Sequence, residues 1–185
     1  FILLSRTLNI IPTIKSRTIK FHLSGMNNEE LGVSKEIYYF FDGNENDILE
    51  FKRQNLSLDD IKFQINTVED IFQIVTEMKN YVSGEFAVKN SLDLTIKYNK
   101  SIELIARRIR FWELENVYFF INEIENELKK EREFLIGFLS KIIINAKNSV
   151  ETEDLKNLIN LKNSIRNNVN IKSVLFNFFD ILQNS

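Results

Sequence analysis

The stretch SIELIARRIRFWELENVYFFINEIENELKKEREFLIGFLSKIIINAKN, residues 101–148, decides the fold. It has no proline and a single glycine, and its apolar residues return in steps of mostly three or four. Such steps place side chains on one face of a helix. This apolar face consists of Ile102, Ile105, Ile109, Trp112, Val117, Phe120, Ile124, Leu128, Leu135, Phe138 and Ile142. The stretch therefore predicts a helical body, and it contains no recognisable catalytic motif.

Length and composition limit the classes of protein to which the chain can belong. Its 185 residues are enough for one ordinary domain, or for a small domain followed by a helical one. A hydrophobic fraction of 44% and a formal charge of -2 indicate a globular protein without overall affinity for polyanions. The absence of cysteine excludes thiolate nucleophiles, thiolate metal sites and disulfides, and we expect a reducing, cytoplasmic location. No apolar run approaches the roughly 20 residues of a membrane-spanning helix.

The first third of the chain has the pattern of β structure. Several segments are rich in β-branched or aromatic residues, or alternate between apolar and polar residues. The clearest pair flanks Asp42-Gly43-Asn44-Glu45-Asn46-Asp47, whose residues tolerate tight turns, so we expect a β-hairpin here. Strands are predicted at 1–11, 13–23, 36–41, 48–53 and 61–65.

The first 28 residues allow a second interpretation. They contain four basic residues and no acidic residue, as in a transit peptide. Pro12 would interrupt a targeting helix, however, and 18–23 alternates like a half-buried strand. We therefore favour a strand.

The period changes from strand to helix at Thr67. This threonine can cap a helix together with Asp70, and the apolar stripe that follows continues until Gly84. Thr152, followed by two acidic residues, predicts the start of another helix, and a last helix is expected at 171–182.

These segments together predict an α+β protein. Segment 92–98 alternates and favours one more strand, although a helix beginning near Ser91 also fits. We expect a small, mostly antiparallel β-rich domain closed by a helix at 1–84, followed by a helical domain at 85–185.

Reactive groups are scarce in this sequence. His22 is the only histidine and lies on the polar side of a predicted strand, where we expect it to be exposed. No glycine-rich phosphate loop, dinucleotide fingerprint or zinc-protease motif is present. We therefore expect no cofactor and no metal, and favour a protein that is not an enzyme.

One alternative is a metal-dependent nuclease on the predicted hairpin. Asp42 followed by Glu50-Phe51-Lys52 is similar to the PD-(D/E)xK pattern, in which two carboxylates hold Mg²⁺ and a lysine orients water. On a strand, Glu50 and Lys52 would share one face. An exposed cross-strand charge pair explains the same residues.

A second alternative is a nucleic-acid surface. Positive charge is mixed with large rings at Arg107, Arg108, Arg110, Phe111 and Trp112. Acidic residues, Glu113 and Glu115 among them, surround this segment, and Glu103 lies one turn before Arg107, where the two can pair. Trp112 falls on the apolar stripe and is expected in the core.

The order of predicted elements from 48 to 84 resembles a known family. A strand, the turn residues Asn55-Leu56-Ser57, a second strand at 61–65 and the helix from Thr67 to Gly84 look like the region before the nuclease in Shedu antiphage defence proteins. The resemblance implies an oligomeric bacterial defence protein whose N-terminal part regulates or assembles a C-terminal nuclease. The chain lacks that nuclease half, so no catalytic residue is transferred to it.

The function that we favour from the sequence is protein–protein interaction, by a regulatory or assembly domain and with a homo-oligomer as the expected state. The last helix has apolar residues on more than one face, so it is either deeply buried or in contact with another chain. We expect self-association through Val174, Leu175, Phe178, Phe179 and Leu182.

Overall fold

The computed structural model describes residues 25–58, 65, 67–84, 91–167 and 169–185. Its helices are α2 (Lys35–Phe40), α3 (Glu45–Arg53), α4 (Val68–Ser83), α5 (Ser91–Arg108), the 3₁₀ turn η1 (Ile109–Phe111), α6 (Leu114–Leu128), α7 (Arg132–Ala146), α8 (Thr152–Ser164) and α9 (Ile171–Asn184). No strand occurs in the residues so described, and the expected α+β class is therefore wrong for this part of the chain. The predictions for 1–11, 13–23 and His22, and most of 61–65, lie outside the described residues.

The predicted hairpin is a pair of helices, α2 and α3. The Ser34 hydroxyl accepts a hydrogen bond from a backbone N–H in the first turn of α2, at 3.3 Å. The Asn44 side chain accepts two such bonds at the start of α3. Capping side chains of this kind satisfy N–H groups that have no partner within the helix. The turn residues recognised in the sequence thus separate two helices instead of two strands.

Burial explains why this segment is helical. Ile48 and Phe51 are buried three residues apart, on one face of α3, whereas a strand would have buried residues 48, 50 and 52. Residues 50 and 52 are Glu50 and Lys52, so an alternating pattern would have placed charge in the core. The aromatic and β-branched residues of 36–41 favoured a strand locally, but packing in the tertiary structure overrides that propensity.

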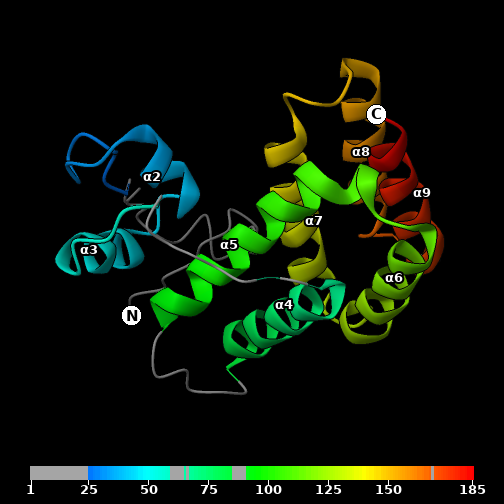
Figure 1. The fold of residues 1–185 in the computed structure, drawn as a ribbon, viewed down its shortest axis with the longest axis horizontal. Coiled ribbons are helices and arrows are strands. Elements are labelled where there is room, and N and C mark those ends of the chain that lie inside the picture. Colours follow the sequence, from blue (N-terminus) through cyan, green and yellow to red (C-terminus); the bar gives the residue numbers. More distant parts are fainter. Residues whose placement is uncertain (1–24, 59–64, 66, 85–90, 168) are drawn as a thin grey trace, which may run out of the picture.

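Helix α5 is the element that both ends of the molecule share (Figure 1). Near its start, Leu92 and Ile96 pack with α2 and α3 in a small core. Further along, Ile102 and Ile105 belong to the large core. The strand favoured at 92–98 is wrong, because a helix buried on opposite sides carries apolar residues at short intervals.

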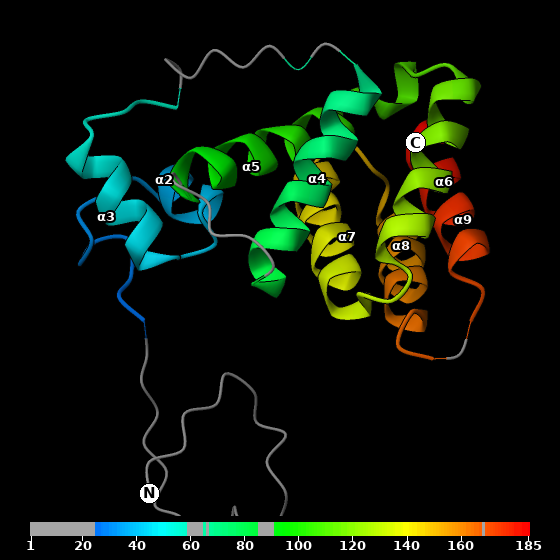
Figure 2. The same ribbon diagram turned by 90° about the horizontal axis from the view of Figure 1, so that it is seen from below.

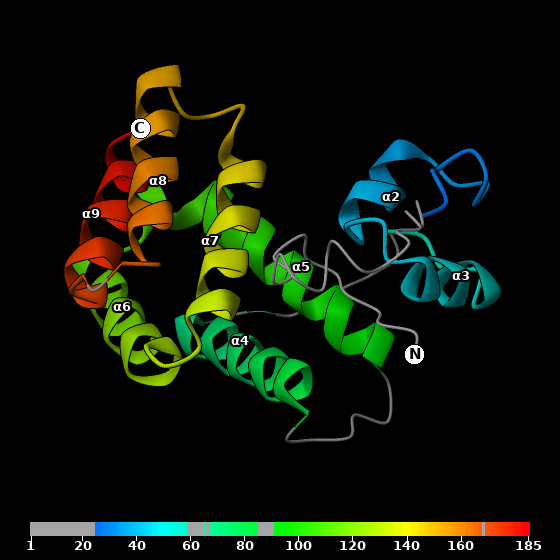
Figure 3. The same ribbon diagram turned by 180° about the vertical axis from the view of Figure 1, so that it is seen from behind.

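The large core is enclosed by α4 to α9, at the end of α5 away from α2 and α3 (Figures 2 and 3). Helices α4 and α7 pack against α5, and α9 packs between α8 and α6. Ten of the eleven apolar residues singled out in 101–148 are buried, and Trp112 is partly buried against them. The predicted helical body is therefore confirmed. Within the described residues, no helix has the length and hydropathy needed to cross a bilayer.

Helix α4 confirms the capping signal read from the sequence. The Thr67 hydroxyl accepts a bond from the backbone N–H of Asp70 (3.1 Å), and the Asp70 carboxylate accepts one from the backbone N–H of Thr67 (3.0 Å). Gly84 ends the helix with a left-handed φ of 78°. Thr152, by contrast, is the first residue of α8, and the cap residue before it, Glu151, makes no side-chain bond to the helix.

These two threonines give a matched test of the caps. We expect Thr67→Ala to lower the free energy of unfolding by about 1 kcal/mol, because it removes a capping hydrogen bond. Thr152→Ala should change the free energy by less than about 0.5 kcal/mol. Urea unfolding followed by circular dichroism measures both. Equal losses in the two variants would show that the capping box does not stabilise α4.

Candidate functional site

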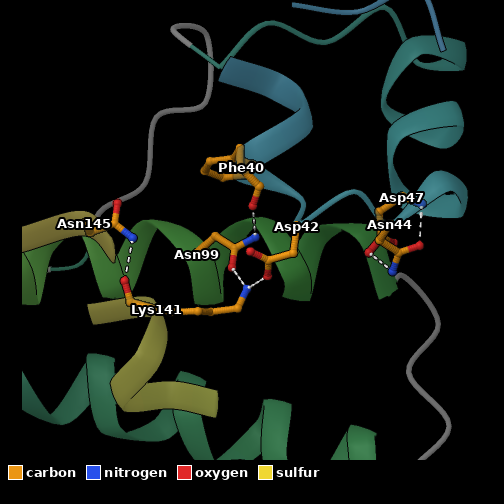
Figure 4. Close-up of polar contacts among 7 residues, drawn as sticks. All are labelled: Phe40, Asp42, Asn44, Asp47, Asn99, Lys141 and Asn145. Carbon is orange, nitrogen blue, oxygen red and sulfur yellow. Dashed lines mark hydrogen bonds and ion pairs between the residues drawn. The ribbon is translucent and has the colours of Figure 1, made fainter. Parts of the chain in front are cut away.

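A polar junction joins the α2–α3 part to the helical body (Figure 4). The Lys141 ammonium of α7 donates to the Oδ1 of Asn99 at 2.8 Å and forms an ion pair with Asp42. The Asn99 amide of α5 donates to the carbonyl of Phe40, the last residue of α2, at 2.7 Å. Three helices and the turn after α2 therefore meet in one network.

The turn after α2 is shaped to place Asp42 in the junction. Asp42 and Gly43 both have left-handed backbone conformations, with φ of 51° and 68°. Aspartate tolerates this region better than most residues, and glycine enters it without strain. A Cβ on Gly43 would also come within 2.8 Å of the Tyr38 hydroxyl. Any residue larger than glycine at position 43 would therefore disturb the turn.

Burial shifts two titratable groups beside this network. It raises the pKa of Asp47, while a hydrogen bond from Thr95 and the charge of Lys141 act in the opposite direction. Burial also raises the pKa of the Tyr98 hydroxyl well above its usual range, and the negative charge of Asp42 adds to this shift. Perturbed pKa values occur both in active sites and in structural ion-pair networks.

The partners of these groups indicate a structural network. Asp47 accepts a hydrogen bond from the Asn44 side chain at 2.8 Å, and Asn99 is only 6% exposed, with its amide bonded on both sides. The Lys141 ammonium also lies 5.3 Å from the centre of the Tyr98 ring. The donors and acceptors are thus already bonded to one another, and the network fixes the α2–α3 part on α5 and α7.

The three residues of the nuclease alternative are not brought together. Asp42 pairs with Lys141, whereas Glu50 accepts hydrogen bonds from Arg53 and Gln54. Lys52 donates to the carbonyl of Leu31 at 2.6 Å. Residues two apart point in different directions on a helix, so the shared face that a strand would have given is lost. No group of three or more acidic or histidine side chains in the described part of the chain could hold a metal ion.

The arginines of the nucleic-acid alternative lie where α5 passes through η1 into α6. We call this surface the α5–α6 corner and define it by Arg107, Arg108, Arg110, Phe111, Glu113, Leu114 and Glu115. All seven residues are exposed, Phe111 by 75% and Leu114 by 65%. The guanidinium of Arg110 lies over the Phe111 ring, 5.0 Å from its centre. An arginine held over an aromatic face is a favourable cation–π contact.

The charged side chains of the corner form no ion pair among the described residues. The pair expected between Glu103 and Arg107 does not form, because Glu103 pairs with Lys100 instead, at 3.2 Å. Trp112 is partly buried and meets Phe120 edge to face, with 5.7 Å between the ring centres, which agrees with its predicted place in the core.

Two of the hollows on the described surface lie beside α8 and beside the corner. One, of about 490 Å³, lies between α8 and α9 and is open; its walls include Asn157, Asn177 and Asp180. The other, of about 340 Å³, lies between the start of α4 and the corner, and Arg108 and Trp112 line it. Each of the two is lined by a single acidic side chain, Asp180 in the first and Glu69 in the second.

The residues predicted for self-association are inside the molecule. Helix α9 directs them into the large core, where they are between 0% and 7% exposed. Folded copies therefore cannot meet through these side chains. The five residues are Val174, Leu175, Phe178, Phe179 and Leu182. Of the two explanations open for this helix, deep burial is the one that the structure supports.

Sequence reasoning missed Asn99, Lys141 and the exposed Leu114, whereas Phe111 was named in the nucleic-acid alternative. Lys141 follows Ser140 within the largely apolar run FLSKIII, and Asn99 follows the buried Tyr98. A charged residue within a largely apolar stretch was the available signal for Lys141. Leu114 gave no such signal, because it resembles the core residues around it.

The described residues thus form a helical protein whose two cores share α5, with a structural polar junction and an exposed corner of arginine, glutamate and apolar side chains. Comparisons with protein-family models, curated proteins and solved structures find no match. Any function must therefore be argued from the surface of the chain itself.

Asn99→Ala tests the junction. It leaves the Phe40 carbonyl without its partner and removes one of the two polar partners of the Lys141 ammonium, which keeps Asp42, and we expect it to lower the free energy of unfolding by about 1–3 kcal/mol. Asn145 is a matched control, since its amide also bonds to a backbone carbonyl, that of Lys141, but it is exposed. Asn145→Ala should change stability by less than about 0.5 kcal/mol. Equal effects in the two variants, measured in urea, would contradict a stabilising junction.

Asp47→Asn tests the electrostatics of the same region. Because burial raises the pKa of Asp47 above its ordinary value of 3.8, the folded protein binds this proton more tightly than the unfolded chain. The stability that this tighter proton binding contributes is fully present below pH 3.8 and is lost as the pH rises through the raised pKa of Asp47. The wild type should therefore lose stability relative to the variant as pH rises from about 3 to about 7. Urea midpoints across this range measure the difference, and a wild type that gains relative stability would contradict the raised pKa.

Proposed function

We propose that this chain is a non-enzymatic protein–protein interaction domain, with a regulatory or assembly role, and that it binds through the α5–α6 corner. The observation that supports this proposal is the exposure of Phe111 and Leu114 beside arginines that form no ion pair within the described part of the chain. Phenylalanine and arginine are both enriched at protein interfaces relative to the rest of the surface.

The backbone of the corner is held in place by buried and hydrogen-bonded residues. Ile109 is 1% exposed, and the Gln183 amide of α9 lies within 3.5 Å of the Ile109 carbonyl and 3.3 Å of the Trp112 carbonyl, to which it donates. Buried or bonded residues therefore hold the turn on both sides of Phe111. A surface that is already ordered loses little conformational entropy when a partner binds.

Nucleic-acid binding remains the second candidate, because three exposed arginines and a stacked Phe111 ring could contact phosphates and bases. Glu113 and Glu115 on the same surface would repel a phosphate backbone, and the chain has a net charge of -2. These charges favour a protein partner over a polyanion.

The biological setting is a further proposal. A role in antiphage defence rests on the resemblance to Shedu proteins, and α3 replaces the first strand of the pattern that suggested it, whereas the Thr67 helix and its Gly84 end are present. A cytoplasmic location rests on the absence of cysteine.

A photo-crosslinking experiment in the native host tests the proposed function. A photoreactive phenylalanine analogue replaces Phe111 in one variant and Ile144 in a control, because Ile144 of α7 is also exposed, by 58%. We expect a cross-linked polypeptide of defined mass from position 111 and none from position 144, since only the corner is proposed to contact a partner. Mass spectrometry identifies the product.

Two results of this experiment would contradict the proposed function. Cross-links that are equally abundant at positions 111 and 144 would indicate nonspecific collisions. A product from position 111 that nuclease treatment removes would favour nucleic-acid binding instead.

A further inference from the structure

We propose that the partner of the α5–α6 corner is a second copy of this chain, in a symmetric dimer that pairs the corner with itself. This inference rests on the proposed function and names its partner. In a two-fold dimer, the same surface is used on both copies, so that the surface must be complementary to itself.

The charges of the corner have this self-complementary order. Arg107, Arg108 and Arg110 come first along the chain, and Glu113 and Glu115 follow. Phe111 lies between the two groups, and Leu114 lies three residues further on, at most about 11 Å away along the chain. A two-fold axis near Phe111 reverses the order in the second copy. The arginines of each copy would then face the glutamates of the other.

Opposite charges so close in sequence would ordinarily pair with one another within the chain. In the described residues they do not: Arg107 lies on α5, whereas Glu113 is the residue before α6, the extended backbone of Trp112 separates them, and neither forms an ion pair. Arg110 is held over the Phe111 ring. The five charges are therefore available to another molecule, and the partner must offer both signs.

Other partner chemistries fit this surface less well. An acidic peptide or a nucleic acid would pair with the arginines but would place like charge against Glu113 and Glu115, which is unfavourable. A basic partner would place like charge against the arginines, which is also unfavourable. A second copy supplies acidic groups opposite the arginines and basic groups opposite the glutamates, and it covers Phe111 and Leu114 with the same apolar side chains.

The first measurement is sedimentation velocity of the full chain at about 1 to about 100 µM. We expect a monomer–dimer equilibrium in this range, because only two of the seven residues of the corner, Phe111 and Leu114, are apolar and exposed charge pairs add little affinity. Leu114→Glu should raise the Kd at least about tenfold, since it places a charge among the apolar side chains. Ile144→Glu is the matched control and should leave the Kd unchanged. A wild type that stays monomeric, or a Kd unaffected by Leu114→Glu, would overturn the dimer.

Exchange of charge is the decisive measurement. One variant carries Arg107→Glu, Arg108→Glu and Arg110→Glu, so that its corner is entirely acidic; the other carries Glu113→Arg and Glu115→Arg, so that its corner is entirely basic. We expect each variant alone to be monomeric because of like-charge repulsion, and an equimolar mixture to form a one-to-one complex. Dimers of either variant alone, or a mixture that stays monomeric, would overturn the inference. Thermal unfolding confirms that both variants fold, which we expect because all five side chains are exposed.

The crosslinking experiment separates this inference from the function on which it rests. A cross-linked product of twice the chain mass from position 111 supports both the interaction function and the symmetric dimer. A cross-linked product with a different polypeptide, together with a wild type that is monomeric in sedimentation, would contradict the symmetric dimer. It would still support the proposed interaction function.

Discussion

The structure depends on the burial of α5 on opposite sides. Its first turns pack into the small core with Leu92 and Ile96, and its later turns pack into the large core with Ile102 and Ile105. Eighteen residues of helix span about 27 Å, which is enough to reach from one core to the other. Neither core is independent of the other, because both need the same helix to be formed and in place.

The polar groups of the junction add a geometric constraint that apolar contacts do not supply. Apolar packing is non-directional, so the small core alone would allow α2 and α3 to shift along α5. Asn99 allows much less freedom, since its amide must meet the Phe40 carbonyl on one side and the Lys141 ammonium on the other. A buried amide left unbonded costs more than the net gain from its hydrogen bonds. The junction therefore specifies the relative position of the two parts more than it contributes to total stability.

The sequence predicted those elements in which local signals and tertiary packing agree. The Thr67 helix has its cap, its apolar stripe and its terminal glycine, and the structure confirms all three. The strand predictions for 36–41 and 48–53 were wrong because aromatic and β-branched residues favour strands locally. The spacing of Ile48 and Phe51 already followed a helical period. The sequence marks Lys141 as unusual, but its partners could not be predicted, since Asp42, Asn99 and Lys141 are far apart in the sequence and meet only in the folded chain. The same is true of α9, whose apolar faces gave no means of distinguishing core from interface.

The corner follows from the way in which α5 ends. The chain must turn there so that α6 can cover the large core, and it does so with Ile109 and Trp112 turned inward and Phe111 between them turned outward. A loop that served only to connect two helices would be expected to expose polar residues at this position, because exposing an aromatic ring to water is unfavourable. The inward residues, bonded through Gln183 to α9, account for the rigidity of the turn but not for the exposed ring. The fold therefore gives no reason for exposing Phe111 and Leu114, and binding of the proposed partner would remove both side chains from water.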